Sequence, residues 1–495
     1  MRRIVYEMKN DMKTGISLHA FFLPIVIIGV MILIPSINAN AEELNKTNVT
    51  DKDIQEKSGQ LSSVQPVSGI TMEGFYYSDR SKQPYCFANA EGRCLQNEFQ
   101  LLTDIEGKAN YSDKFRAYYR AEMNDDGDVR LKKAYGVLRT GILSWEVGKD
   151  TVWMGPGYHG SFLLSDNAEG FLLARVKTEE PFRLPWLLSN LGEFKYDLFH
   201  GWSQNFKVLG HRLSWRPMPL FEFGANQVVY YASNKHYSLS EYPGVLFSST
   251  DNSGDRSNPY DNDQKASFDI ALDMPFLSAI PPLKTGRIYA EYGGNDSFAA
   301  WQNEDKATFK TMWDRQDTKY VWPIGLDFLE IGWLAGLFLT TGDVDLRVEY
   351  AQNFTSYPLF YDLYDEYNAN RRQGNWYTDM NTRDGMITGH HMGNNADDLF
   401  FELVYRKNPF TISINYDQER RGISDKNSTT DNPPEYRTQY GLKPSYKIGR
   451  YTLFSDLIYI HRRNVDSSSN ALNVTVQPGA RVDDYIVGIG VSINL

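Results

Sequence analysis

Long apolar runs are almost absent from this 495-residue chain, and so is cysteine, with two residues. Beyond residue 41 no window holds the roughly 18 consecutive apolar residues that a membrane-spanning helix needs. The nearest candidate, residues 324–339, is interrupted by Asp327 and Glu330. These absences exclude a multi-span helical membrane protein. An excess of basic residues is also missing, because the formal net charge is -11, which argues against nucleic acid as a partner.

The two cysteines, Cys86 and Cys94, stand close together in the chain. In an exported protein such a pair is expected to close a small loop as one disulfide. Metal binding is the weaker alternative, because neither a CxxC spacing nor a histidine cluster accompanies them.

The first 41 residues are typical of a secretory signal peptide. Four basic residues precede an apolar run at residues 20–34, and Ala39 and Ala41 supply small side chains at the usual cleavage offsets. A transmembrane anchor is the alternative, but two prolines shorten the apolar run below the length of a spanning helix. We therefore expect residues 1–41 to direct export through the Sec pathway to the outer membrane of a Gram-negative cell.

The chain as a whole is aromatic-rich yet polar on average, with 14% aromatic residues and a mean hydropathy of -0.48. A water-soluble enzyme and a membrane barrel both show this mixture, and periodicity distinguishes them. In residues 265–274, Phe268 and Ile270 alternate with polar residues such as Asp269. This alternation has a period of two residues, which is the period of a β-strand. The same split recurs in residues 343–350. A membrane barrel needs one apolar face on each strand.

The C-terminal stretch "YIVGIGVSINL" at residues 485–495 places an apolar side chain at every second position up to Leu495. A soluble sandwich also alternates. An uninterrupted apolar face that reaches the last residue, however, resembles the closing strand of outer-membrane barrels, which the barrel-assembly machinery recognises. Such strands usually end in Phe, and Leu495 departs from that pattern.

These patterns predict an all-β fold, a single transmembrane antiparallel β-barrel of about 16–18 strands at 9–11 residues per strand. We expect it over residues 67–495, surrounded by outer-membrane lipids and lipopolysaccharide and preceded by a flexible periplasmic arm at residues 42–66. Short turns such as residues 216–219 are expected to face the periplasm. Long outward loops are expected at about residues 233–264, 293–322, 352–397, 418–437 and 462–484.

Residues 148–171, "GKDTVWMGPGYHGSFLLSDNAEGF", interrupt the alternation and fit no regular element. Their glycines permit close approach of the backbone to other groups. We expect this segment to lie between two barrel strands and to fold into the lumen, which it would partly plug. There Trp153, Tyr158 and Asn167 are candidates for packing or for sugar binding.

The same segment closely resembles the signature of the Wzi family of capsule assembly proteins, outer-membrane barrels that behave as lectins for surface polysaccharide. The resemblance implies capsular or exopolysaccharide as the partner. The best-known members carry a periplasmic helical bundle, whereas residues 42–66 offer at most one short helix, which does not favour such a bundle here. The resemblance continues in order at residues 209–227, 268–276, 288–296, 389–406 and 416–422.

Polysaccharide binding needs aromatic faces for the C–H groups of sugars and arginine forks for hydroxyl or carboxylate groups. The alternative for any single aromatic residue is a place in a membrane-interface girdle, and for an arginine a partner across a polar lumen. The preferred candidates lie far from any alternating strand and are Arg371, Arg372, Trp376 and Tyr377. Further candidates are Lys235, His236, Tyr237, Trp301, Trp313, Arg315, Arg420 and Arg421.

The pair His390 and His391, which precedes Asp397 and Asp398, would suit a protease or lipase dyad, or a metal pair. No GxSxG or HExxH motif accompanies these residues. We therefore expect them, like His159, to form hydrogen bonds in the lumen, and we assign no catalytic residue, metal or cofactor. Two functions remain: a polysaccharide-binding barrel, or a diffusion porin, because a barrel of this strand number has an aqueous lumen unless it is filled.

Overall fold

The computed structural model describes residues 63–495, apart from residues 82, 205, 239, 243–244, 246–261, 296–329, 354–380, 394–395, 423–432 and 466–477. Within these described residues, no helix has both the length and the apolar character needed to cross a membrane.

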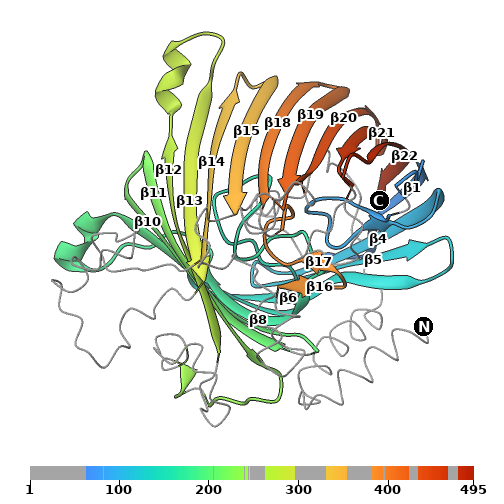
Figure 1. Cartoon of the computed structure of the whole chain (residues 1–495). Helices are drawn as coiled ribbons and strands as arrows, with labels where there is room; N and C mark the ends of the chain where they lie inside the picture. The colour runs from blue at the N-terminus through green and yellow to red at the C-terminus, as the bar shows by residue number, and fades with distance from the viewer. Residues whose placement is uncertain are drawn as a thin grey trace.

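Eighteen strands form one closed antiparallel barrel, in which each strand pairs with the next barrel strand along the chain (Figure 1). β1 (Ser63–Tyr77) closes the ring because it pairs with β4 (Phe99–Tyr111) on one side and with β22 (Arg481–Asn494) on the other. The all-β barrel of about 16–18 strands is confirmed. The boundary expected at residue 67 is too late, because Ser63 already pairs with Asn110.

The other barrel strands follow in chain order and are joined alternately at the two ends. They are β5 (Phe115–Asn124), β6 (Val129–Thr140), β7 (Leu143–Asp150), β8 (Phe171–Thr178), β9 (Glu193–Trp202), β10 (Phe206–Met218), β11 (Phe221–Ala232), β12 (Asp263–Asp273), β13 (Thr285–Asn295), β14 (Glu330–Thr340), β15 (Val344–Asn353), β18 (Ala396–Lys407), β19 (Phe410–Arg421), β20 (Glu435–Ile448) and β21 (Tyr451–Arg463).

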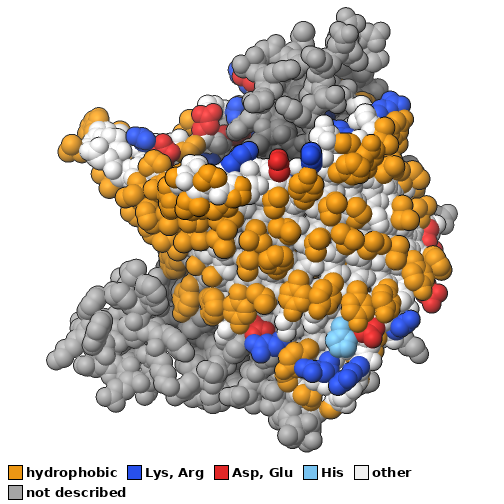
Figure 2. Space-filling model, turned by 90° about the horizontal axis from the view of Figure 1, so that it is seen from above, with side chains coloured by type: hydrophobic (Ala, Val, Ile, Leu, Met, Phe, Trp, Pro, Cys, Tyr) orange, Lys and Arg blue, Asp and Glu red, His pale blue; other side chains and the backbone are white. Residues whose placement is uncertain are grey.

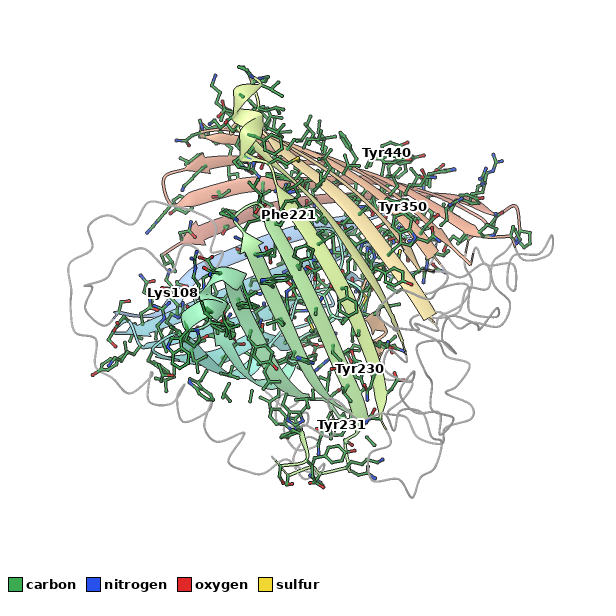
Figure 3. The ribbon with its side chains drawn as sticks, turned by 90° about the vertical axis from the view of Figure 1, so that its left-hand side faces the viewer. Lys108, Phe221, Tyr230, Tyr231, Tyr350 and Tyr440 are labelled. Carbon is green, nitrogen blue, oxygen red and sulfur yellow. A yellow bond between two sulfur atoms is a disulfide. The ribbon has the colours of Figure 1, made fainter. Side chains whose placement is uncertain are left out.

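The two ends of the barrel differ in the length of their connections. At one end, each of the five long connections expected from the sequence joins consecutive barrel strands, for example β11 to β12 and β15 to β18. The other end has short turns, such as the one between Met218 and Phe221. It also holds two 3₁₀ helices, η2 (Trp186–Leu191) and η3 (Pro275–Ala279). Figure 3 shows Phe221 at one end of β11, with Tyr230 and Tyr231 at the other.

The apolar face of the strands lies outside the barrel. Phe268 and Ile270 are 38% and 41% exposed, whereas Asp269 between them is buried. Figure 2 shows apolar side chains spread over the outer face of the barrel, with charged side chains gathered toward its margins. Polar side chains inside and an apolar belt outside are the arrangement of a membrane-spanning barrel.

Three connecting segments fold into the lumen, and we call them together the plug: residues 83–98, 151–170 and 381–393. The first holds the hairpin of β2 (Tyr85–Cys86) and β3 (Cys94–Leu95), in which a disulfide joins Cys86 to Cys94. The third holds the hairpin of β16 (Thr382–Arg383) and β17 (Met386–Ile387), which lies within the ring of strands (Figure 1). The inward folding expected of residues 148–171 is therefore observed, and two further segments join it.

Apolar clusters hold the plug against three sectors of the barrel wall. The hairpin of β2 and β3 packs on β1, β4, β21 and β22 through Tyr85 and Leu95. The middle segment packs on β8 to β11 through residues that include Leu163 and Leu164. The remaining cluster joins the middle and third plug segments to β12, β13, β14, β15 and β18, and its members are Phe162, Ala271, Tyr289, Leu334, Ala351, Ile387, Met392 and Ala396.

The outer belt can be tested with a charge placed in the middle of the last strand. We expect Ile489→Lys, at a site that is 69% exposed on β22, to lower the free energy of unfolding in lipid vesicles by about 2–4 kcal/mol. The matched control is Ile448→Lys at the turn end of β20, a site 51% exposed, where the cost is about 0–1 kcal/mol near the membrane interface. Equal effects in denaturant titrations would contradict this placement of the belt.

Candidate functional site

Close packing explains the glycines of the middle plug segment. A Cβ added at Gly157 would stand 2.0 Å from the carbonyl oxygen of Gly160. A Cβ at Gly160 would stand 2.2 Å from the ring of His390, in the third plug segment. Both positions therefore require the absence of a side chain, and they bring two plug segments into contact.

One carboxylate of the barrel wall anchors this turn. Glu349, on β15, accepts hydrogen bonds from the backbone N–H groups of Tyr158 (2.7 Å) and His159 (3.1 Å). Its Oε2 atom also accepts a bond from the hydroxyl of Tyr289, on β13, at 2.6 Å. Glu349 is 2% exposed, so these bonds supply the partners that a buried carboxylate requires.

His159 then lies among aromatic and acidic groups at the wall. Its ring stacks on Phe400, with centroids 3.7 Å apart and planes at 10°. Its Nε2 atom lies 3.5 Å from carboxylate oxygens of both Asp398 and Asp417. His391, from the third plug segment, contacts the same Asp398, and its Nδ1–H donates a hydrogen bond to Glu419 at 2.9 Å.

The neighbouring His390 is fully buried between the plug segments. Burial lowers the pKa of His390 well below its usual value, and the adjacent His391 and His159 add to the effect. His390 is therefore neutral at physiological pH, which suits a ring packed against Gly160 and Phe162.

Tyr158 projects its side chain into the lumen and stays 45% exposed. The guanidinium of Arg347 lies over its ring, 4.2 Å from the centroid, and its hydroxyl donates a hydrogen bond to Glu402 at 3.0 Å. Burial of the hydroxyl, with the nearby Glu402 carboxylate, raises the pKa of Tyr158 to about 12. An aromatic ring beside a guanidinium and a carboxylate has the functional groups that contact sugars in proteins.

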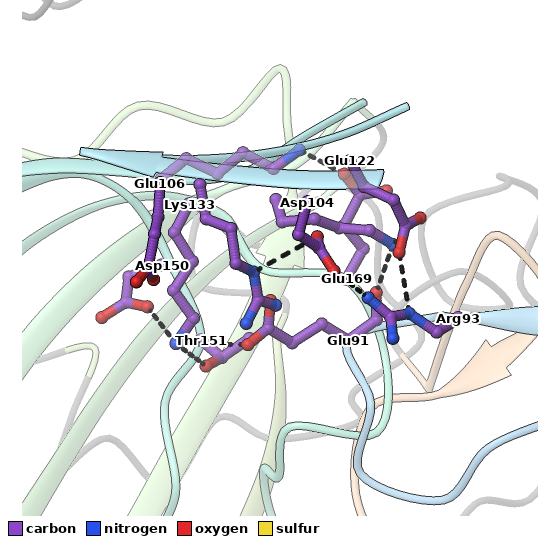
Figure 4. A network of polar contacts seen from close by, with 12 residues as sticks. Glu91, Arg93, Asp104, Glu106, Glu122, Lys133, Asp150, Thr151 and Glu169 are labelled. Atoms are coloured by element: carbon purple, nitrogen blue, oxygen red, sulfur yellow. Dashed lines mark hydrogen bonds and ion pairs between the residues drawn. The ribbon is translucent and has the colours of Figure 1, made fainter. Parts of the chain in front are cut away.

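A charged network ties the first plug segment to the opposite wall (Figure 4). Arg93 pairs with Glu73 of β1 at 3.2 Å, with Glu122 of β5 at 2.8 Å, and with Asp104 of β4. Glu91 from the same hairpin pairs with Lys133 of β6 at 3.4 Å. The fork of donors on one arginine thus joins the plug to three strands.

Asn167 connects the three plug segments to one another. Its side-chain amide donates to the carbonyl of Ile387 at 2.9 Å, and its side-chain oxygen accepts from the backbone N–H of Asn89 at 3.3 Å. The residue is 2% exposed. Trp153, the other candidate of this segment, is half-buried.

Five of the remaining candidates from the sequence fall within the described residues. Lys207 donates to the carbonyl of Lys235 at 2.6 Å and contacts the ring of His236 at 3.3 Å, while Tyr237 packs edge-on against Tyr231. Arg420 and Arg421 end β19, and Arg420 pairs with Asp397 at 2.8 Å. The others fall outside the described residues: Trp301, Trp313, Arg315, Arg371, Arg372, Trp376 and Tyr377.

Two groups of this region were missed by sequence reasoning. Glu349 belongs to an alternating strand, and nothing in the sequence distinguishes it from the other polar residues that face the lumen. Arg93 has no motif around it beyond the neighbouring Cys94. Their importance depends on which loops fold inward, and a one-dimensional pattern does not contain that information.

Comparisons with known proteins agree with this architecture. Residues 77–310 match the family model described as capsule assembly protein Wzi. A Klebsiella pneumoniae protein described as an uncharacterized 55.8 kDa protein in the cps region is 27% identical over 151 residues, which are 28% of this chain and 29% of that protein. The matched part of the chain thus spans less than a third of that curated relative.

One solved structure shares the fold. Escherichia coli Wzi, described as an outer membrane protein involved in group 1 capsule assembly and a carbohydrate-binding β-barrel, aligns with a TM-score of 0.57 at 14% identity, over 87% of this chain and 85% of that chain. OccD3 (OpdP) of Pseudomonas aeruginosa aligns with a TM-score of 0.45 at 11% identity, over 88% of this chain and 91% of that chain. Residues 77–310 are therefore similar to the Wzi family of capsule assembly proteins.

Proposed function

We propose that this outer-membrane barrel binds capsular or exopolysaccharide at the cell surface and anchors or organises that layer. The observation that carries the proposal is the plug, which places three segments inside the barrel and fastens them to the wall. The match of residues 77–310 to a capsule assembly family supports it, as do the carbohydrate binding described for the E. coli structure and the cps region described for the Klebsiella relative.

The alternative, a diffusion porin, needs an open lumen. An 18-stranded barrel encloses an aqueous channel unless side chains or loops fill it. Here Arg93 fastens the plug to β1, β4 and β5, while Glu349 fastens it to β15. A plug held on opposite sides favours a binding barrel over a channel.

The outward loops are the proposed place of glycan contact, with Arg371, Arg372, Trp376 and Tyr377 as its centre and Trp301, Trp313 and Arg315 as further contacts. Tyr158 is a second candidate because its ring is exposed beside Arg347. Asn167 has its polar side-chain atoms engaged within the plug, so its proposed role is to support the site. We assign no catalytic role to any residue.

The membrane partners follow from the surface of the barrel. We propose that the apolar belt contacts outer-membrane lipids and lipopolysaccharide, and that β22 with Leu495 engages the barrel-assembly machinery. Residues 1–41, the proposed signal peptide, and most of the proposed arm lie outside the described residues.

Retention of the purified protein on immobilised polysaccharide from its own bacterium tests the proposed function. We expect the wild type to be retained, and Arg371→Ala with Trp376→Ala to reduce retention at least about tenfold, since loss of an arginine fork and a stacking ring removes on the order of 2 kcal/mol. The matched control is Arg183→Ala with Trp186→Ala, at exposed positions on the turn end. A wild type that passes through the column would contradict the proposal, and equal retention of both variants would contradict the chosen loop.

The anchoring role of Glu349 is tested by removing its carboxylate. Each hydrogen bond to a charged group contributes about 1.5–3 kcal/mol, so Glu349→Ala should speed amide exchange of residues 157–160 by on the order of 100-fold or more. Hydrogen–deuterium exchange with mass spectrometry measures this. Glu222→Ala is the control, because Glu222 is a lumenal carboxylate paired with Arg216 and Arg287 near the turn end. Unchanged exchange in Glu349→Ala would show that the anchor is not needed.

A further inference from the structure

The plug and the wall bring histidine and aspartate side chains together at one buried point. His159 comes from the middle plug segment and His391 from the third, while Asp398 and Asp417 come from β18 and β19. One ligand atom each of His159, His391 and Asp398 lies within 4.8 Å of the others. Residues far apart in the chain thus converge here from four separate elements.

The distances within this cluster are long for hydrogen bonds. Asp398 Oδ2 lies 3.5 Å from His159 Nε2 and 3.4 Å from His391 Nε2, and Asp417 Oδ2 lies 3.5 Å from His159 Nε2. Charged hydrogen bonds are about 2.7–2.9 Å long. Zinc lies about 2.0–2.2 Å from nitrogen and oxygen ligands, so two ligands of a tetrahedral ion stand about 3.4 Å apart.

The side chains of the cluster are also buried and hold unpartnered polar atoms. The side chains of Asp398 and His391 are 2% and 5% exposed. Among the described residues, Nε2 of His159 and Nε2 of His391 have no hydrogen-bond partner, and neither does the second carboxylate oxygen, Oδ1, of Asp398 and of Asp417. Unsatisfied polar atoms in a buried position cost free energy, and a cation between them would remove that cost.

The surroundings of His391 resemble the outer shell of a metal site. Its Nδ1 atom is hydrogen-bonded to Glu419 Oε1 at 2.9 Å, and Glu419 Oε2 lies 3.5 Å from Arg437 Nη1. A carboxylate on the far nitrogen of a metal-binding imidazole fixes its tautomer and its orientation. This arrangement directs Nε2 of His391 toward Asp398.

We propose that His159, His391 and Asp398 bind one divalent transition-metal ion of the zinc type, with Asp417, 3.5 Å from His159, as the neighbouring fourth ligand. Two imidazoles with two carboxylates suit zinc and its neighbours, whereas calcium and magnesium prefer oxygen ligands alone. The charge balance agrees, because the three neighbouring carboxylates of Asp398, Asp417 and Glu419 are buried, and Arg437 interacts with Glu419 and Asp417. The ion would fasten two plug segments to the wall, which makes its role structural, and the proposal departs from our expectation from the sequence that no metal is bound.

Metal titration of the intact protein tests this site. Full-length mature protein without an affinity tag is purified in detergent, treated with a chelator, dialysed, and titrated with Zn²⁺ by calorimetry and with Co²⁺ by absorption. We expect one equivalent of Zn²⁺ per chain and, for Co²⁺, the visible bands of a tetrahedral ion. We also expect Zn²⁺ to raise the unfolding temperature of the barrel, which is measured by the change in gel mobility after heating.

Variants then assign the binding to these residues. His391→Gln and Asp398→Asn should lose the bound equivalent while remaining heat-modifiable on the gel. The matched control is His461→Gln, which changes an exposed histidine that pairs with Asp483 at 2.7 Å, away from the cluster, and it should bind like the wild type. A wild type that takes up no Zn²⁺ at micromolar concentrations overturns the proposal whether or not the variants fold, and so does full binding by Asp398→Asn.

Discussion

The structure depends on one constraint, the inverted polarity of a barrel whose apolar side chains face the membrane. Phe268 and Ile270 point outward, and Asp269 between them must then point into the lumen, where Arg212 pairs with it at 2.6 Å. Repeated around the barrel, this alternation lines the lumen with charged and polar groups. Such a lining either remains hydrated, as in a channel, or needs partners from another part of the chain.

The plug supplies those partners. Arg93 satisfies carboxylates on three strands, and Glu349 receives the backbone of Tyr158 and His159. The glycines at 157 and 160 let the same segment pass close to its neighbours. Apolar clusters complete the attachment on three sectors of the wall. The lumen therefore has the packed side chains and paired charges of a protein interior. This agrees with a protein that binds polysaccharide at its outer surface.

The strands could be predicted from the sequence because their period is local. The alternation around Phe268 and the apolar face ending at Leu495 each fix a strand and its outward side without knowledge of any neighbour. The inward course of residues 151–170 was also predictable, from glycines crowded among aromatic residues. The two other plug segments, the role of Glu349 and the meeting of His159 with His391 were not, because each depends on contacts between different elements, such as the one between Glu349 and His159, which are 190 positions apart.

The candidate glycan contacts show the same division. The irregular segment predicts Tyr158 as a candidate contact, and this residue does lie exposed beside Arg347. It predicts Asn167 as well, yet the side-chain amide of Asn167 holds the plug together. The central claim, that the plug closes the barrel, is tested most directly by the conductance of the purified wild type in planar lipid bilayers. The account predicts no large, steady channels, and steady channels of porin size would contradict it.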